Sequence, residues 1–126
     1  MAARTILKLM AALVVGLGMS VSVPAGEADV VAVQVTKTGE NTYRFDVTVR
    51  HEDAGWDHYA NQWEVLAPDG AVLGTRVLLH PHDNEQPFTR SLSGVEIPPE
   101  VTEVTVRARD NEHDWGGRQQ KVRLPD

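Results

Sequence analysis

Cysteine is absent from this chain of 126 residues. Disulfide bonds, thiolate nucleophiles and thiolate metal ligands are therefore excluded, and a lipid carried on an N-terminal cysteine has no attachment atom. The stability of the chain must come from apolar burial and backbone hydrogen bonding. Any metal bound here would depend on imidazole and carboxylate ligands.

A long apolar run is also missing. The uncharged stretch from Leu9 to Leu17 is too short to span a bilayer. Arg4 and Lys8 precede it and Val23-Pro24-Ala25 follows it, an arrangement typical of an export signal. We expect cleavage after Ala25, which divides the chain into a signal peptide, residues 1–25, and one domain, residues 26–126. A periplasmic or secreted protein is expected, with no membrane insertion after cleavage.

An excess of basic charge is lacking as well. Outside the expected signal peptide the chain has ten basic and 18 acidic residues, a net charge of −8. Because the phosphates of nucleic acids require a basic face, we expect no nucleic-acid partner.

Helical periodicity is not convincing anywhere. From Asp29 onward apolar residues repeat with a period of two, which predicts half-buried strands separated by turns. Val31, Val33 and Val35 are expected to alternate in the first strand, and later strands are expected to have a bulge at Gly74 and a bend at Gly94. The expected strands cover residues 29–37, 43–50, 59–67, 71–79, 88–97, 104–108 and 122–124.

Seven short strands in about 100 residues predict an all-β fold, a seven-stranded antiparallel sandwich of the immunoglobulin or fibronectin type III kind. Trp63 in the third strand agrees with this fold, because such sandwiches often bury a tryptophan there.

All five histidines fall in loops that alternate along the chain. If consecutive strands run antiparallel, the second, fourth and sixth connections lie at the same end of the sandwich. These connections carry His51, His58, His80, His82 and His113, together with eight carboxylates. The sequence therefore predicts one end of the domain rich in both imidazole and carboxylate.

Such an end is a candidate site for a divalent metal. His80 and His82 would point to the same side of an extended segment. His51 continues the inward alternation of the second strand, and His58 and His113 complete the candidate ligands. Imidazole and carboxylate without thiolate favour Zn(II), Cu(II) or Ni(II). The alternative is that these rings only cap turns and bond to backbone carbonyls.

Two tryptophans lie in the same loops. Trp56 and Trp115 are interpreted either as a platform on which a ligand stacks or as lids over the open end of the core, and large aromatic side chains favour the lid. Charged neighbours complete a candidate ligand or partner surface, namely Asp57, Glu85 and Asp114.

Three segments stand out: Gly55-Trp56-Asp57-His58-Tyr59-Ala60, the stretch from His80-Pro81-His82 through Asn84 to Leu92, and His113-Asp114-Trp115-Gly116-Gly117. Together they resemble a group of small exported bacterial domains of unassigned activity. The resemblance covers most of the chain after residue 25 and implies an exported β-sandwich. It implies no reaction and no catalytic residue.

The sequence thus favours a non-enzymatic exported binding module, with a metal ion as the sharper hypothesis. The alternative is a structural domain of the bacterial envelope that meets another envelope protein or a cell-wall polymer without metal. An enzyme would need an open coordination position and a general base such as Glu85 or Glu112.

Overall fold

The computed structural model describes residues 26–126, and the expected signal peptide lies outside the described residues. Seven strands follow one another along the described chain. They are β1 (Asp29–Lys37), β2 (Thr42–Arg50), β3 (Ala60–Leu66), β4 (Val72–Val77), β5 (Phe88–Glu96), β6 (Glu103–Asp110) and β7 (Gln120–Arg123). Within residues 26–126, no helix is long and apolar enough to cross a membrane.

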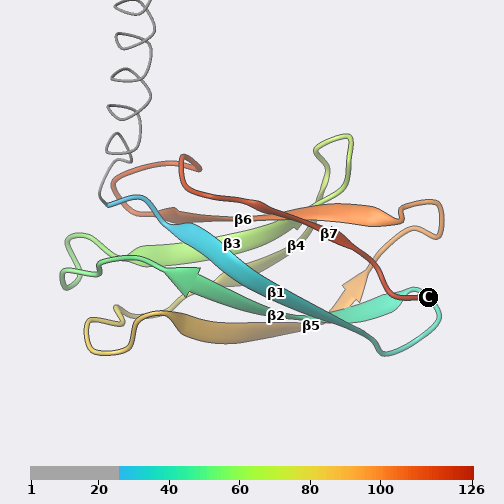
Figure 1. Cartoon of the computed structure of the whole chain (residues 1–126), viewed down its shortest axis with the longest axis horizontal. Coiled ribbons are helices and arrows are strands. Elements are labelled where there is room, and N and C mark those ends of the chain that lie inside the picture. Colours follow the sequence, from blue (N-terminus) through green and yellow to red (C-terminus); the bar gives the residue numbers. More distant parts are fainter. Residues whose placement is uncertain (1–25) are drawn as a thin grey trace, which may run out of the picture.

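The strands form two antiparallel sheets that face each other (Figure 1). One sheet has three strands in the order β1-β2-β5, and the other has four in the order β4-β3-β6-β7. Every strand pair is antiparallel. The predicted all-β sandwich of seven antiparallel strands is therefore confirmed.

Alternation along the central strands explains the two layers. In β2, residues Tyr43, Phe45, Val47 and Val49 are buried, whereas the residues between them are exposed or half-buried. Successive side chains of a strand point to opposite faces, so this pattern places one apolar face of the sheet against the other sheet.

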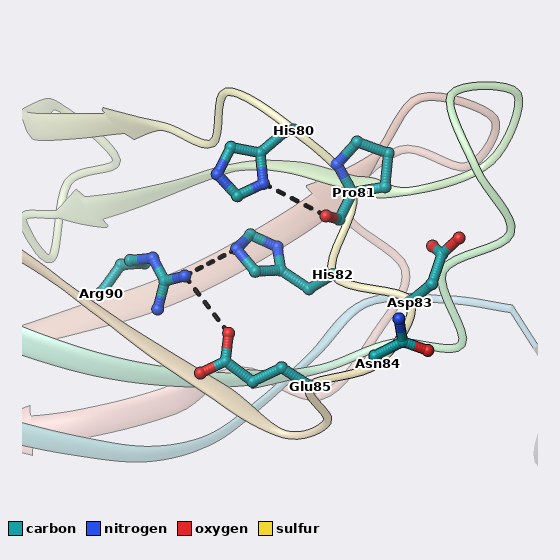
Figure 2. A pocket seen from close by; sticks show the side chains of 7 residues that line it. All are labelled: His80, Pro81, His82, Asp83, Asn84, Glu85 and Arg90. Carbon is teal, nitrogen blue, oxygen red and sulfur yellow. Dashed lines mark hydrogen bonds and ion pairs between the residues drawn. The ribbon is translucent and has the colours of Figure 1, made fainter.

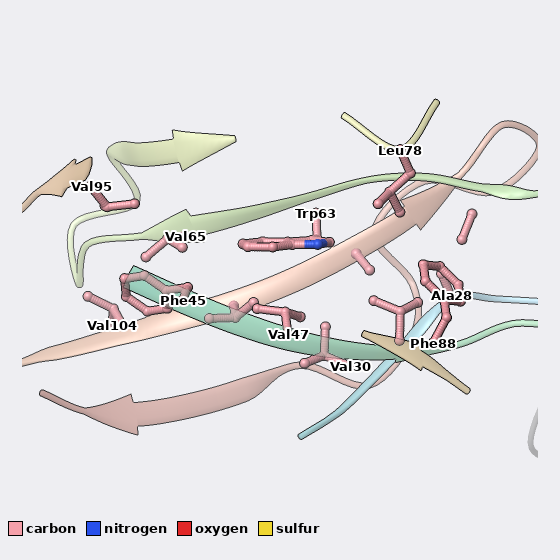
Figure 3. Close-up of a cluster of buried hydrophobic side chains, with 14 of the residues drawn as sticks. Ala28, Val30, Phe45, Val47, Trp63, Val65, Leu78, Phe88, Val95 and Val104 are labelled. Carbon is pink, nitrogen blue, oxygen red and sulfur yellow. The ribbon is translucent and has the colours of Figure 1, made fainter. Parts of the chain in front are cut away.

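The core lies between the sheets and is built mainly from aliphatic side chains around a few rings (Figure 3). Trp63, Phe45 and Phe88 are the largest side chains that are fully buried, and Trp63 was expected in the core from the sequence. Complete burial of a large apolar side chain contributes about 1.5–3 kcal/mol. In a chain without disulfides this burial is the main source of stability.

The first strand differs from its prediction. A register shift lies between Val30 and Ala32 where β1 pairs with β2. Val30 is fully buried as a result, while Val31, Val33 and Val35 are only half-buried. The expected alternation therefore misses the residue of β1 that enters the core most deeply.

The bulge expected at Gly74 and the bend expected at Gly94 agree with the pairing. A register shift in the β3–β4 ladder lies beside Gly74, and another in the β2–β5 ladder lies near Gly94. Gly94 has a φ of +70°, a backbone conformation that favours glycine. A Cβ on Gly74 would lie 3.0 Å from Leu92 of the facing sheet, so the sheets approach closely there.

Strand pairing brings four chain segments to one end of the sandwich. Asp29 at the start of β1 pairs with Arg50 at the end of β2, and Ala60 at the start of β3 pairs with Asp110 at the end of β6. The candidate site is built from residues at these strand ends and just outside them.

Candidate metal centre

The three loops with histidines lie at the same end of the sandwich, as the alternation of strands predicts. The ring of His51, which follows β2, lies 4.7 Å from that of His58 before β3, measured between centroids. The ring of His58 lies 5.1 Å from that of His113, which follows β6. Three of the five histidines thus form one cluster.

The centre of this cluster is a carboxylate. Asp110 is the last residue of β6, and its side chain is completely buried. Its Oδ2 lies 3.0 Å from Nε2 of His51, 3.3 Å from Nε2 of His58 and 3.0 Å from Nδ1 of His113. Three imidazoles therefore surround a single oxygen atom.

A backbone carbonyl enters the same cluster. The carbonyl oxygen of Gly26 lies 2.8 Å from Nε2 of His51 and 3.1 Å from Nε2 of His58. The two nitrogens thus alternate with the oxygens of Gly26 and Asp110 in a ring of four donor atoms, which we call the donor ring. One donor atom from each of His51, His58 and Asp110 lies within 4.8 Å of the other two.

Buried hydrogen bonds hold the donor ring in place. Nδ1 of His51 lies 2.5 Å from Oδ1 of Asp53, whose side chain is completely buried. The backbone N–H of Ala60 donates to the same oxygen, and that of His82 donates to Oδ2 of Asp53. A carboxylate behind a ligand imidazole is the arrangement that orients such rings in metalloproteins.

The carboxylate of Asp110 is held in its ionised form. Burial would raise the pKa of Asp110, but hydrogen bonds from the backbone and ring of His113 and from the backbone of Glu112 outweigh it and lower that pKa. The backbone N–H groups of Glu112 and His113 donate to Oδ1, which leaves Oδ2 for the donor ring.

The pKa of His113 shifts in the opposite direction. The hydrogen bond between its ring and Asp110 raises the pKa of His113 above its ordinary value, and the charges of Asp110, Glu27 and Glu112 act in the same direction. The ring of His113 contacts both oxygens of the Asp110 carboxylate and is not part of the donor ring.

The remaining two histidines, His80 and His82, are not part of the donor ring and line a separate pocket (Figure 2). Their centroids are 4.7 Å apart, so they share one side of their segment as expected. His82 is buried, stacks on Phe88 and accepts a hydrogen bond at Nε2 from Arg90, 2.9 Å away. His80 is exposed, and its Nδ1 lies 3.2 Å from the carbonyl oxygen of Pro81. They line an open depression of about 390 Å³ next to Asp83, Asn84 and Glu85.

His82 is a poor metal ligand in this arrangement. Burial lowers the pKa of His82, and the positive charge of Arg90 lowers it further. Since the guanidinium occupies the lone pair of Nε2, a neutral His82 carries its proton on Nδ1. That nitrogen is buried, has no hydrogen-bond partner and lies 3.9 Å from Asp53.

The residues of the expected ligand or partner surface lie at separate places. Trp56 is 64% exposed and packs edge-on against Tyr59, so it does not cover the core as a lid. Trp115 is half-buried, with Arg107 and Arg109 over its ring. The charged members are all exposed: Asp57, Glu85 beside Arg90, and Asp114 beside Arg109.

Three residues of the cluster were not among the predicted site residues. Asp110 continues the inward series Val104, Val106 and Ala108, and a carboxylate at an inward position is a signal that the sequence does contain. Asp53 and Gly26 offer weaker signals. The contact of Gly26 comes from its backbone carbonyl, which every residue has.

Together the fold and the site define a small β-sandwich domain with a histidine and carboxylate cluster at one end. No family model matches the chain, and no solved structure matches it. It is similar to a protein of Halomicrobium mukohataei named putative lipoprotein, with 44% identity over 92 residues. The match covers 73% of this chain and 45% of that protein, so the chain spans less than half of its relative.

Proposed function

We propose that this domain is an exported, non-enzymatic module that binds a divalent metal ion through His51, His58, Asp110 and the backbone carbonyl of Gly26. The observation that carries the proposal is the donor ring, in which two imidazole nitrogens and two oxygens are separated by 2.8–3.3 Å along its four edges. Tetrahedral ligands with metal bonds of about 2.0–2.1 Å lie about 3.3 Å apart, and square-planar ones slightly closer. The spacing fits an ion at the centre.

Hydrogen bonding alone satisfies the donor ring less well. Both nitrogens of His51 face only oxygen atoms, namely those of Asp53, Asp110 and Gly26. A neutral imidazole has one N–H and one lone pair, so with Nδ1–H on Asp53 the lone pair of Nε2 would face two oxygens. A metal cation in the ring removes this repulsion, and the two buried carboxylates, Asp53 and Asp110, supply negative charge that favours it.

The chemistry of the donors favours Zn(II), Cu(II) or Ni(II). Imidazole suits these ions, and the absence of cysteine removes the ligands that favour Cu(I) and iron–sulfur clusters. Four donors from the protein are typical of sites that hold a metal, whereas catalytic sites keep a coordination position open. This difference supports binding rather than catalysis.

Export is part of the same proposal. The charged start, short apolar run and small residues before Gly26 are typical of a signal peptide, and the similar protein of Halomicrobium mukohataei carries the name "putative lipoprotein". We place the domain in the periplasm or outside the cell. Its strand order also agrees with a sandwich of the fibronectin type III kind.

Calorimetric titration of the exported protein with Zn(II), Cu(II) and Ni(II) tests the proposal. We expect one ion per chain, with binding lost in His58→Ala and unchanged in His80→Ala. His80 is the matched control, because it is a histidine at the same end of the domain but outside the donor ring. Absence of binding for all three ions, or equal weakening by both variants, contradicts the proposed site.

A second function is favoured by one observation, the 64% exposure of Trp56 beside Tyr59. Exposed aromatic side chains are enriched where proteins bind partners, which supports an envelope protein or a cell-wall polymer as the partner. A partner captured from envelope extract should then be lost with Trp56→Ala and retained in the presence of a chelator. Loss of the partner on addition of a chelator alone would indicate that the bound metal, and not Trp56, is needed for partner binding.

A further inference from the structure

Gly26 lies between the rings of the metal centre. A Cβ on this residue would lie 3.1 Å from Cε1 of His58 and 3.2 Å from Cε1 of His113, and its φ is +98°. Both the space and the backbone conformation therefore favour glycine at this position. A side chain at this position would meet two imidazoles, and the backbone nitrogen is bonded to the same α-carbon.

The chain after Gly26 is anchored firmly. Ala28 is buried, and the backbone N–H of Val30 donates to the carbonyl of Arg118 at 2.8 Å. A Cβ on Gly116 would collide with the carboxylate of Glu27, and one on Gly117 with the carbonyl of Ala28. The segment that follows β6 thus packs closely against residues 27 and 28 and keeps Gly26 at the donor ring.

The expected cleavage site lies immediately before this residue. Hydrolysis of the Ala25–Gly26 amide adds one water molecule and leaves a carboxylate on Ala25 and an α-amino group on Gly26. Before cleavage the nitrogen of Gly26 is an amide, whose lone pair is delocalised into the carbonyl and binds metals poorly. After cleavage it is an amine and an effective donor.

We infer that removal of the signal peptide completes the metal centre, because the freed α-amino group of Gly26 binds the ion together with the carbonyl oxygen of the same residue. This inference rests on the proposed function. The amine nitrogen and the carbonyl oxygen of one residue close a five-membered ring with a metal ion. The donor set becomes three nitrogens and two oxygens, which favours Cu(II) or Ni(II) over Zn(II). High affinity is then gained only by the processed protein.

The test uses protein exported from the full-length chain, with its N-terminus determined by intact mass. Lys37 and Lys121 are the only lysines after residue 25, and both are exposed. In the variant with Lys37→Arg and Lys121→Arg, the α-amino group is the only primary amine left after cleavage. Acetic anhydride then acetylates this group selectively, and hydroxylamine removes adventitious acetyl groups from tyrosine. Unmodified protein of the same variant is the matched control.

We expect acetylation to weaken Cu(II) binding at least about tenfold, since loss of even an outer-shell partner of a metal site costs about 10–100-fold. The visible band of bound Cu(II) should move to longer wavelength as a nitrogen donor is lost, while the circular dichroism stays the same. Equal affinity and equal spectra with and without acetylation overturn the inference and leave the proposed function intact. An N-terminus other than Gly26 overturns it as well. Failure of both samples to bind any of the three ions overturns the proposed function and this inference with it.

Discussion

Oδ1 of Asp53 lies 2.5 Å from Nδ1 of His51, and this contact turns Nε2 of the ring toward Asp110. The other oxygen of Asp53 accepts the backbone N–H of His82 at 2.6 Å. One buried carboxylate therefore orients the candidate metal ligand and also attaches the loop that contains His80 and His82.

Asp53→Asn should weaken both the fold and the metal centre. The amide oxygen can replace one carboxylate oxygen, but its NH₂ group would face an N–H of either Ala60 or His82. A buried donor left without an acceptor costs about 1–3 kcal/mol. We expect a loss of this size in urea denaturation, and metal binding about 10–100-fold weaker in calorimetry.

Asp57→Asn is the matched control, because Asp57 is an exposed carboxylate in the same loop. It should change the free energy of unfolding by less than about 0.5 kcal/mol. Similar losses in the two variants would mean that the general charge of the loop, rather than the contacts of Asp53, supports the site.

Val30→Ala should destabilise the domain more than Val31→Ala. Val30 is fully buried beside the register shift in β1, whereas Val31 is half-buried. Removing two buried methyl groups costs about 2 kcal/mol, against less than about 1 kcal/mol at the half-buried position. Denaturation midpoints with an unchanged m-value measure the difference. A larger cost at Val31 would show that β1 pairs in the other register in solution.

This pair of valines also shows why the fold could be predicted from sequence and one register could not. The strict alternation of apolar and polar residues in β2 specifies its two faces directly. Residues 30, 31, 33 and 35 are all valine, so the apolar pattern of β1 is compatible with either register. An extra residue in a strand leaves no mark in such a run, because the pairing with β2 decides it.

The positions of the histidines were predicted to a similar extent. Alternating chain direction correctly placed His51, His58 and His113 at one end, because this argument needs only the order of strands and loops. It could not separate these rings from His80 and His82, since the separation depends on side-chain partners such as Arg90 and Asp53. Asp110 could have been found by extending the inward alternation of β6 by one residue.

Acid should destabilise the domain through His82. Five neighbours act on this ring: Arg90, His80, Asp53, Glu85 and the stacked ring of Phe88. Burial, followed by the charge of Arg90, lowers the pKa of His82 although Asp53 and Glu85 act to raise it, so the unfolded chain binds more protons than the native state as the pH falls below about 6.5. The contribution of a neutral His82 to stability is therefore present above that pH and is lost as the pH falls through the folded pKa.

Denaturation of the wild type and of His82→Gln between pH 7.5 and 5 measures this contribution. The variant should lose less stability over this range than the wild type. His113, whose pKa is raised, acts in the opposite direction in both proteins and cancels in the comparison. His80→Gln serves as the control for an exposed histidine in the same segment. Parallel pH profiles for the wild type and His82→Gln would contradict a neutral, buried His82.

Metal binding should raise the free energy of unfolding, because an ion that binds only the folded domain shifts the unfolding equilibrium toward the folded state. At an ion concentration one hundred times the dissociation constant, the free energy of unfolding rises by about 2.7 kcal/mol. For a domain of this size the melting temperature then rises by about 10 °C or more. Zn(II) should produce this shift in the wild type and in His80→Ala but not in His58→Ala. Mg(II), which prefers oxygen ligands, should produce none. A shift that Mg(II) reproduces would show that screening of the acidic surface, and not the donor ring, stabilises the fold.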